Sequence, residues 1–289
     1  MKNMKSIGAT MRMRILKNDM MEMLQFPALA DCCNISHFIT TRIGGVSQGN
    51  FASMNPSVYT VDDKEAVEEN MKRLSRFIEL PADRIIAPHQ VHKDNVGVLD
   101  ETFLQMSESD RRVFLEGLDA LVTQVPGLCV AVATADCVPV LLYAPDKQVV
   151  AAVHAGWRGT VQRIVQKSVQ IMKEVYDCDP ALMMAGIGPS ISRSAFEVGD
   201  EVVLAFSEAG FPMDTICCRN SETGKAHIDL WEANRFLLLE SGLIDLHVET
   251  ANICTYFNYE YLFSARRLGV QSGRILSGIF ICDDKEQLS

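Results

Sequence analysis

The sequence predicts one domain of the α+β class, in which mixed β-sheets pack against helices. Three observations indicate this architecture. Short Val-rich segments have the length of buried strands, longer segments carry apolar residues at helical spacing, and no linker, repeat or low-complexity stretch divides the chain. The 289 residues, 48% of them hydrophobic, are enough to bury a core without disulfides or a structural metal.

The first residues differ in composition from the rest of the chain. Half of the 14 methionines lie within residues 1–23, and five basic residues precede the first acidic one, Asp19. This segment lacks the apolar stretch of about 7–15 residues that a secretory signal needs. We therefore expect a disordered tail at residues 1–25 and a single catalytic domain over residues 26–289.

Strands are predicted where about four to eight apolar or alternating residues are bounded by turn residues. Gly44-Gly45 ends the first of them, and Pro126-Gly127 separates two others. Pro145 favours a tight turn that pairs the two Val-rich segments beside it as a hairpin. In chain order, the expected strands are residues 35–42, 84–87, 95–99, 121–124, 128–134, 138–143, 148–154, 181–187, 247–252 and 274–281.

Helices are predicted where apolar side chains recur every three or four residues. In the first such segment Val67, Met71 and Leu74 share one face, and charged residues occupy the others. The polar stretch at residues 101–116 is expected to be a loop with one short helix. In chain order, the expected helices are residues 62–80, 160–176, 198–209 and 230–241.

Charge and cysteine content exclude several classes of protein. With 27 Lys+Arg against 37 Asp+Glu, the formal charge of −10 argues against binding to nucleic acid or to an anionic membrane. The longest apolar run, residues 128–143, is interrupted by Asp136 and is shorter than the roughly 20 residues that span a bilayer. Nine cysteines form no CxxC pair, which argues against zinc-ribbon, Fe–S and thioredoxin-like sites, and their odd number favours reduced thiols and a cytoplasmic protein.

A Cys and two His are candidates for a metal site. Cys137 lies between two predicted strands, and His154 ends the strand that follows, so that the hairpin brings them to one end of a sheet. His89 and His92 lie on a separate loop, and their spacing does not show which one would join. Three such ligands with an open fourth position are the pattern of a catalytic zinc site. A core cysteine and ordinary loop histidines would give the same pattern.

Two segments resemble the signatures of the YfiH family. They are residues 134–142 (TADCVPVLL) and 152–159 (AVHAGWRG). The family was formerly described as multicopper polyphenol oxidoreductases or laccases and is now assigned as purine nucleoside phosphorylases. Further matching segments follow in the same order along the chain: residues 40–47, 90–92, 186–189, 197–199, 229–231, 254–255 and 263–264.

The resemblance implies a fold and a set of ligands. The family fold is a single mixed α/β domain, distantly similar to cysteine hydrolases. Its zinc ligands correspond to His92, Cys137 and His154, so His89 returns to being a loop residue. Lys93 and Ala265 depart from the family pattern, as do residues 53–56 and 194–196. These departures leave the three ligands intact and affect the expected shape of the substrate pocket.

The implied reaction needs groups besides the metal. Phosphorolysis requires an anion pocket, for which Arg42, Arg158 and Arg266 are the candidates, because guanidinium groups bind phosphate. Asp136, next to the ligand cysteine, is a candidate general acid or base, or an orienting residue. The aromatic rings of Trp157 and Phe263 are candidates to stack on a purine.

Three functions are compatible with these residues. The favoured one is a zinc-dependent phosphorylase of inosine, adenosine or methylthioadenosine, with adenosine deamination as a second activity. Its partners are a small purine nucleoside and phosphate, and the protein is expected to be a monomer or a homodimer. The second function is a cysteine hydrolase in which Cys137 attacks an amide of a peptidoglycan precursor. The third is a polyphenol oxidase loaded with Cu²⁺, although six histidines are too few for the ligand set of a laccase.

Overall fold

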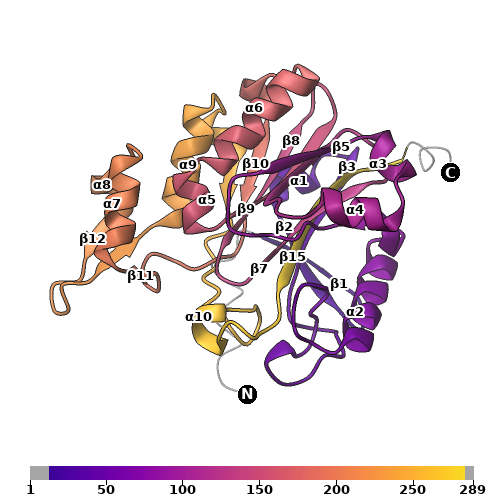
Figure 1. Ribbon diagram of the computed structural model, residues 1–289, viewed down its shortest axis with the longest axis horizontal. Coiled ribbons are helices and arrows are strands. Elements are labelled where there is room, and N and C mark those ends of the chain that lie inside the picture. Colours follow the sequence, from indigo (N-terminus) through magenta and orange to yellow (C-terminus); the bar gives the residue numbers. More distant parts are fainter. Residues whose placement is uncertain (1–12, 284–289) are drawn as a thin grey trace.

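The computed structural model describes residues 13–283, which form two six-stranded sheets and one three-stranded sheet (Figure 1). The first sheet contains, in spatial order, β1 (Arg14–Lys17), β2 (Glu22–Gln25), β3 (Ile35–Thr40), β15 (Ile275–Ile281), β7 (Cys129–Thr134) and β4 (Ile85–Ile86). The second contains β14 (Val248–Thr250), β10 (Met184–Ile187), β8 (Val138–Ala144), β9 (Val149–Ala155), β6 (Ala120–Thr123) and β5 (Val96–Leu99). The third contains β11 (Glu197–Val198), β13 (Ala226–Ile228) and β12 (Cys217–Arg219).

Helices α2 (Lys64–Phe77), α6 (Ile164–Tyr176) and α9 (Leu230–Glu240) cover the outer faces of the large sheets. The other long helix is α7 (Asp200–Glu208). The short ones are α1 (Pro27–Ala30), α3 (Glu101–Gln105), α4 (Glu108–Phe114), α5 (Trp157–Val161), α8 (Met213–Ile216) and α10 (Ala265–Leu268). The small sheet, α7 and α8 project from one end of the molecule (Figure 1).

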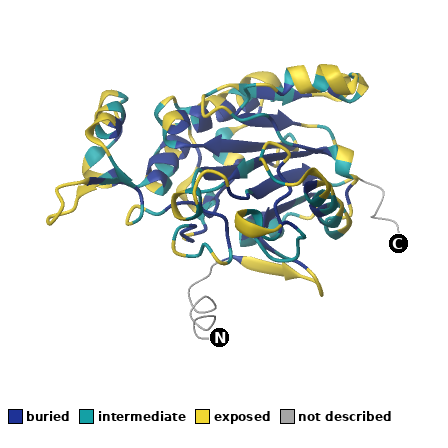
Figure 2. Cartoon of the chain, turned by 60° about the horizontal axis from the view of Figure 1, so that its bottom comes forward, coloured by how far each residue is buried: buried dark blue, intermediate teal, exposed yellow. Residues whose placement is uncertain are grey.

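The two large sheets pack face to face, and helices flank them. Side chains of β8 alternate: Leu141 and Tyr143 face the first sheet, whereas Val140 and Leu142 face α6 and α9. On the other side of the sandwich, Leu74 of α2 packs against the outer face of the first sheet. Figure 2 shows these strands as the buried centre of the molecule. The expected α+β class and its mixed sheets are therefore confirmed.

The predicted hairpin is the part of the fold that matters most for the site. β8 and β9 pair antiparallel, with Val138 opposite Ala155 and Pro139 opposite His154. β7 belongs to the first sheet and β8 to the second, so residues 135–137 cross from one sheet to the other. Asp136 adopts a left-handed backbone conformation in this crossing, with φ of 89°.

The structure corrects the expectation of a tail at residues 1–25. Residues 14–25 contain β1 and β2, and β2 pairs with β3 through Leu24 opposite Ile39. Met23 and Leu24 are fully buried, because Met23 packs with Leu74 of α2 on the outer face of the first sheet and Leu24 packs in the core between the two large sheets. The rest of the expected tail, residues 1–12, lies outside the described residues.

The helix expected at residues 160–176 is two helices. Gly156 precedes α5, which begins earlier than expected, and Arg163 separates α5 from α6 with a left-handed φ of 64°. The Arg163 guanidinium donates to the carbonyl of Ala209 and pairs with Glu240, contacts that helical periodicity does not reveal. The polar stretch at residues 101–116 likewise contains two short helices, α3 and α4, instead of one.

Candidate metal centre

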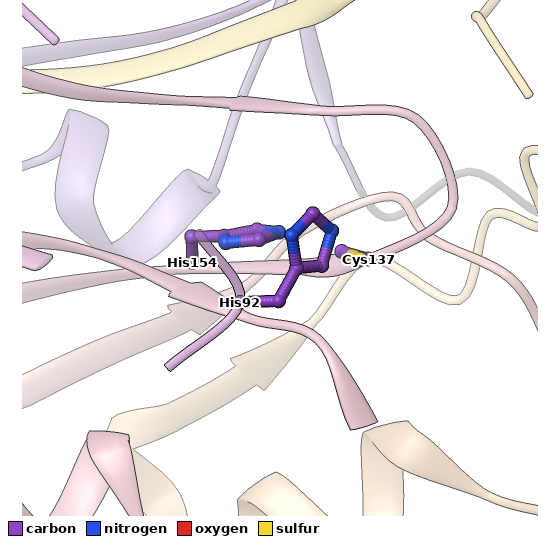
Figure 3. Close-up of side chains that lie close together, drawn as sticks. All are labelled: His92, Cys137 and His154. Carbon is purple, nitrogen blue, oxygen red and sulfur yellow. The ribbon is translucent and has the colours of Figure 1, made fainter. Parts of the chain in front are cut away.

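His92, Cys137 and His154 meet at one end of the sandwich. His92 comes from the loop between β4 and β5, Cys137 from the crossing between β7 and β8, and His154 from β9. Their ligand atoms all lie within 4.8 Å of one another, and the side chains converge (Figure 3). The two imidazole rings lie edge to face with centroids 4.8 Å apart. Within residues 13–283, this is the one group of three His, Cys, Asp or Glu side chains that could share a metal ion.

Asp119, a residue that the sequence analysis missed, holds the side chain of His154 and the backbone of His92 in place. Its buried carboxylate accepts the Nδ1–H of His154 at 2.7 Å, which leaves Nε2 of His154 for Cys137 or a metal. The same carboxylate accepts the backbone N–H groups of His92 at 2.9 Å and Lys93 at 2.8 Å. The backbone N–H of Val91 also donates to it, at 3.2 Å. The only signal in the sequence was a carboxylate directly before a buried strand.

The electrostatics favour a thiolate at Cys137. Burial by itself raises the pKa of this thiol, but the charge and hydrogen bond of His154, helped by His92, outweigh it and lower the pKa to about 6. Burial lowers the pKa of His154, but the Cys137 thiolate and the hydrogen bond to Asp119 outweigh it and raise the pKa to about 9. A thiolate beside two imidazoles suits Zn²⁺, so the residues present fit the expected metal.

Gly156 has no side chain, and this makes room for the three ligand side chains to meet. A Cβ at this position would lie 3.1 Å from Sγ of Cys137 and 3.3 Å from Cδ2 of His92. Any side chain here would therefore push against the ligands. His89 is separate from the group: its Nδ1 bonds to Oε1 of Glu116 at 2.7 Å, and its ring stacks on Tyr59.

Two cavities border the ligands: His92 and Cys137 line both, and His154 lines the smaller one. The larger, about 530 Å³, contains the aromatic side chains Trp157 and Phe196 and the arginines Arg158 and Arg266 in its wall. The smaller, about 350 Å³, has a different set of lining residues that includes Ser57, Tyr59, His89, Thr134 and Arg274. Both cavities share a common boundary: His92, Ala135, Cys137, Ala265 and Val270.

The predicted arginines divide into two groups. Arg158 and Arg266 line the larger cavity beside the ligands. Arg42 lines neither cavity, because its guanidinium donates to the carbonyls of Ala52 and Tyr259 and lies over the ring of Phe263. The sequence analysis missed Arg274, which lines the smaller cavity and which nothing distinguished from a surface arginine in the sequence.

The structure also places Asp136 and the two aromatic residues that were predicted to stack on a purine. Asp136 lines the larger cavity, but its carboxylate accepts hydrogen bonds from the hydroxyls of Thr255 at 2.7 Å and Ser264 at 2.6 Å. It also accepts the backbone N–H of Arg266 at 2.6 Å, so the structure gives it an organising role. Trp157 lines the larger cavity, whereas the predicted stacking ring Phe263 is fully buried and lines neither cavity.

The chain matches known proteins over almost its whole length. Residues 36–282 match the family model described as "Multi-copper polyphenol oxidoreductase laccase". A protein from Bacteroides thetaiotaomicron named purine nucleoside phosphorylase is 47% identical over 259 residues, which is 90% of this chain and 96% of that protein. A protein from an unknown prokaryotic organism named adenosine deaminase RL5 is 39% identical, over 85% of this chain and 94% of that protein.

A solved structure also shares the fold. The crystal structure of YlmD from Geobacillus stearothermophilus superposes with a TM-score of 0.84 at 29% sequence identity. It covers 93% of this chain and 99% of that chain. Among residues 13–283, no helix combines the length and the hydropathy that crossing a membrane requires.

Proposed function

The chain belongs to the YfiH family, and from this premise we propose that it is a zinc-dependent purine nucleoside phosphorylase with adenosine deamination as a second activity. The observation that carries the proposal is that His92, Cys137 and His154 meet, and that two of them, His92 and Cys137, lie at the boundary of two cavities. A centre between two cavities suits a reaction of two substrates, a nucleoside and phosphate. The names of the relatives from Bacteroides thetaiotaomicron and from the unknown prokaryote support both activities.

Three side chains would hold the zinc. Nε2 of His154 is available because Nδ1 is bonded to Asp119, and Cys137 supplies a thiolate. His92 completes the set, with its backbone fixed by the same aspartate. When bound, zinc supplies Lewis acidity, which stabilises negative charge that develops on a substrate atom.

The phosphorolysis itself is a transfer of a glycosyl group. An oxygen of hydrogen phosphate forms a bond to C1′ while the C1′–N9 bond breaks, and the electron pair of that bond stays on the purine. The purine takes up the proton that hydrogen phosphate gives up, so that free base and sugar 1-phosphate result. The protein has to place the two substrates in line and exclude water, which would give hydrolysis instead.

Metal analysis and an assay of base release test the proposal. Protein is purified without added metal, its zinc and copper contents are measured, and inosine, adenosine and methylthioadenosine are incubated with and without phosphate. We expect stoichiometric zinc and base release that depends on phosphate. Cys137→Ser is expected to lose both. Base release that ignores phosphate, or that persists in Cys137→Ser, would contradict the mechanism.

A second candidate function follows from the contacts of Cys137. Cys137, His154 and Asp119 stand in the order of a nucleophile, its base and an orienting carboxylate, and the pKa of the thiol is lowered. This arrangement favours a cysteine hydrolase acting on an amide, such as one in a peptidoglycan precursor. Alkylation separates the two functions. A zinc ligand reacts with iodoacetamide only after the metal is removed, whereas a nucleophile reacts in the protein as purified.

Oxidation of phenols has the weakest support of the three functions. Six histidines in the chain and one three-ligand group in the described residues do not provide the ligands of several copper ions. The affinity of Cu²⁺ for nitrogen and sulfur ligands would still allow copper to occupy the same three side chains. Oxidase activity should then follow the copper content and disappear when zinc replaces copper.

A further inference from the structure

The two cavities are lined by different groups, although both border His92 and Cys137. The larger cavity contains the carboxylate of Asp136, the guanidinium groups of Arg158 and Arg266, and the aromatic rings of Trp157 and Phe196. Among the residues that line the smaller cavity, none is Asp or Glu, and one is an arginine. Cys137 borders both cavities.

Arg274 brings a partly buried positive charge to the smaller cavity. Burial lowers the pKa of its guanidinium, which still remains protonated at neutral pH. The group is held in position by backbone carbonyls: one nitrogen donates to Ser272 and Gly273, and the other donates to Val270. These carbonyls fix the guanidinium and carry no net charge, whereas the charges of Cys137 and Asp136 act on it and favour its protonated form. A fixed, partly desolvated cation attracts an anion more strongly than an exposed side chain does.

Thr134 adds a hydroxyl that has no partner. The residue is 1% exposed, lines the smaller cavity, and its Oγ1 makes no hydrogen bond within the protein. A buried hydroxyl without a partner costs about 1–3 kcal/mol, so such groups are rare unless a ligand completes them. In the register of β7 and β15, Thr134 lies opposite Ile275, the residue that follows Arg274 in the chain.

We infer that the smaller cavity binds inorganic phosphate, the second substrate, through Arg274 and Thr134. The inference rests on the proposed function and adds to it the place where phosphate binds. The guanidinium supplies charge, and the hydroxyl supplies a hydrogen bond to a phosphate oxygen. His92, Cys137 and His154 border the same cavity, so the phosphate lies next to the proposed metal centre.

The larger cavity then takes the purine. Arg158 lies over the ring of Trp157 with its Cζ 4.2 Å from the ring centroid, and Arg266 lies over the ring of Phe196 at 5.6 Å. Such stacked guanidinium groups extend a flat wall against which a base can pack. This assignment moves Arg158 and Arg266 from the expected phosphate pocket to the nucleoside side, and it places the reacting sugar at the boundary beside Ala265.

Steady-state kinetics of Thr134→Val tests the inference, because this substitution removes only the hydroxyl. The holoprotein is assayed with inosine and phosphate, each varied at saturating levels of the other. We expect the KM for phosphate to rise about tenfold and the KM for inosine to stay within about twofold. Thr134→Ser should restore the KM for phosphate. Arg158→Gln is the matched variant in the other cavity and should raise the KM for inosine only.

Folding does not confound this test. Since Thr134→Val removes an unpartnered hydroxyl, the variant should unfold at the same temperature as the parent or a higher one. Arg274→Lys keeps the charge but loses the fixed geometry, and it should also raise the KM for phosphate. An unchanged KM for phosphate in Thr134→Val and Arg274→Lys, together with an increase in Arg158→Gln, would overturn the inference and leave the proposed function intact.

Calorimetric titration of the holoprotein with inorganic phosphate alone separates the two claims. If Thr134→Val weakens phosphate binding about tenfold while no purine nucleoside is cleaved by the parent, the binding site stands and the proposed function fails. If the parent cleaves inosine with phosphate and both proteins bind phosphate equally well, the proposed function stands and the site is wrong.

Discussion

Replacement of Asp119 by Asn is expected to weaken metal binding and to destabilise the metal-free protein. Oδ1 of Asp119 accepts hydrogen bonds from Nδ1 of His154 and the backbone N–H of His92, and Oδ2 accepts those of Val91 and Lys93. Asparagine has one oxygen and one NH₂ group, and the NH₂ group cannot accept hydrogen bonds. Two of the four donors therefore face an NH₂ group instead of an acceptor, whichever way the amide is turned.

The magnitude depends on which two bonds are lost. If the amide NH₂ faces Val91 and Lys93, two backbone N–H groups lose their partner at about 1–3 kcal/mol each, or about 2–6 kcal/mol together. If it faces His154, the imidazole must carry its proton on Nε2 to accept at Nδ1, and Nε2 is then unable to bind a metal. Loss of such an orienting carboxylate typically lowers metal affinity by about 10–100-fold.

Competitive titration of the metal-free proteins with Zn²⁺ and a chelating dye measures the affinity, and urea unfolding measures the stability. Leu74→Ala is the control, because Leu74 is fully buried in the core beneath α2 and its truncation costs about 2–5 kcal/mol. That variant should lose stability and keep its zinc affinity. Asp119→Asn with zinc affinity within about threefold of the parent would refute the assigned role of Asp119.

Three other substitutions or conditions test separate parts of the structure. Gly156→Ala should lower zinc affinity and activity with little effect on metal-free stability, because the added methyl group would lie 3.1 Å from Sγ of Cys137; unchanged affinity would contradict this packing. Burial lowers the pKa of His37 from 6.5 to about 4, so the unfolded chain binds the proton more readily and stability falls as the pH drops from 6.5 towards 4. The free energy of unfolding should fall by about 3 kcal/mol over this range. His37→Gln should remove this part of the pH dependence, which urea unfolding at each pH measures. Deletion of residues 1–25 should lower the free energy of unfolding by about 3–6 kcal/mol, because the burial of Met23 and Leu24 is lost. If the truncated protein unfolded at the same temperature as the parent, β2 would be dispensable.

Local patterns in the sequence predicted most of the regular structure. The hairpin of β8 and β9 was predictable because Val-rich strands and the turn at Pro145 lie next to each other in the chain. α2 was predictable because its helical periodicity is also local. Where the pattern was weak, the prediction failed: β1 and β2 lie in a segment whose composition resembles a tail, and their strands form by pairing with β3.

The ligand residues required more than pattern. Spacing singled out Cys137 and His154 but left His89 and His92 equivalent, and the resemblance to the YfiH family favoured His92. The structure places His92 beside the other two because Asp119 binds the backbone of its loop, while His89 turns outward to Glu116.

The sequence by itself determined the strands of the two large sheets except β1 and β2, the approximate positions of the long helices, and the residue types from which a metal centre can be built. It did so because hydrophobic periodicity and turn residues act over a few positions along the chain. The tertiary structure alone decided that Asp119 orients His154, 35 residues away, and that Arg274 and Thr134 line one cavity while Arg42 lines none. These assignments depend on how two sheets cross and pack, and contacts between distant segments leave no periodic signal in either segment.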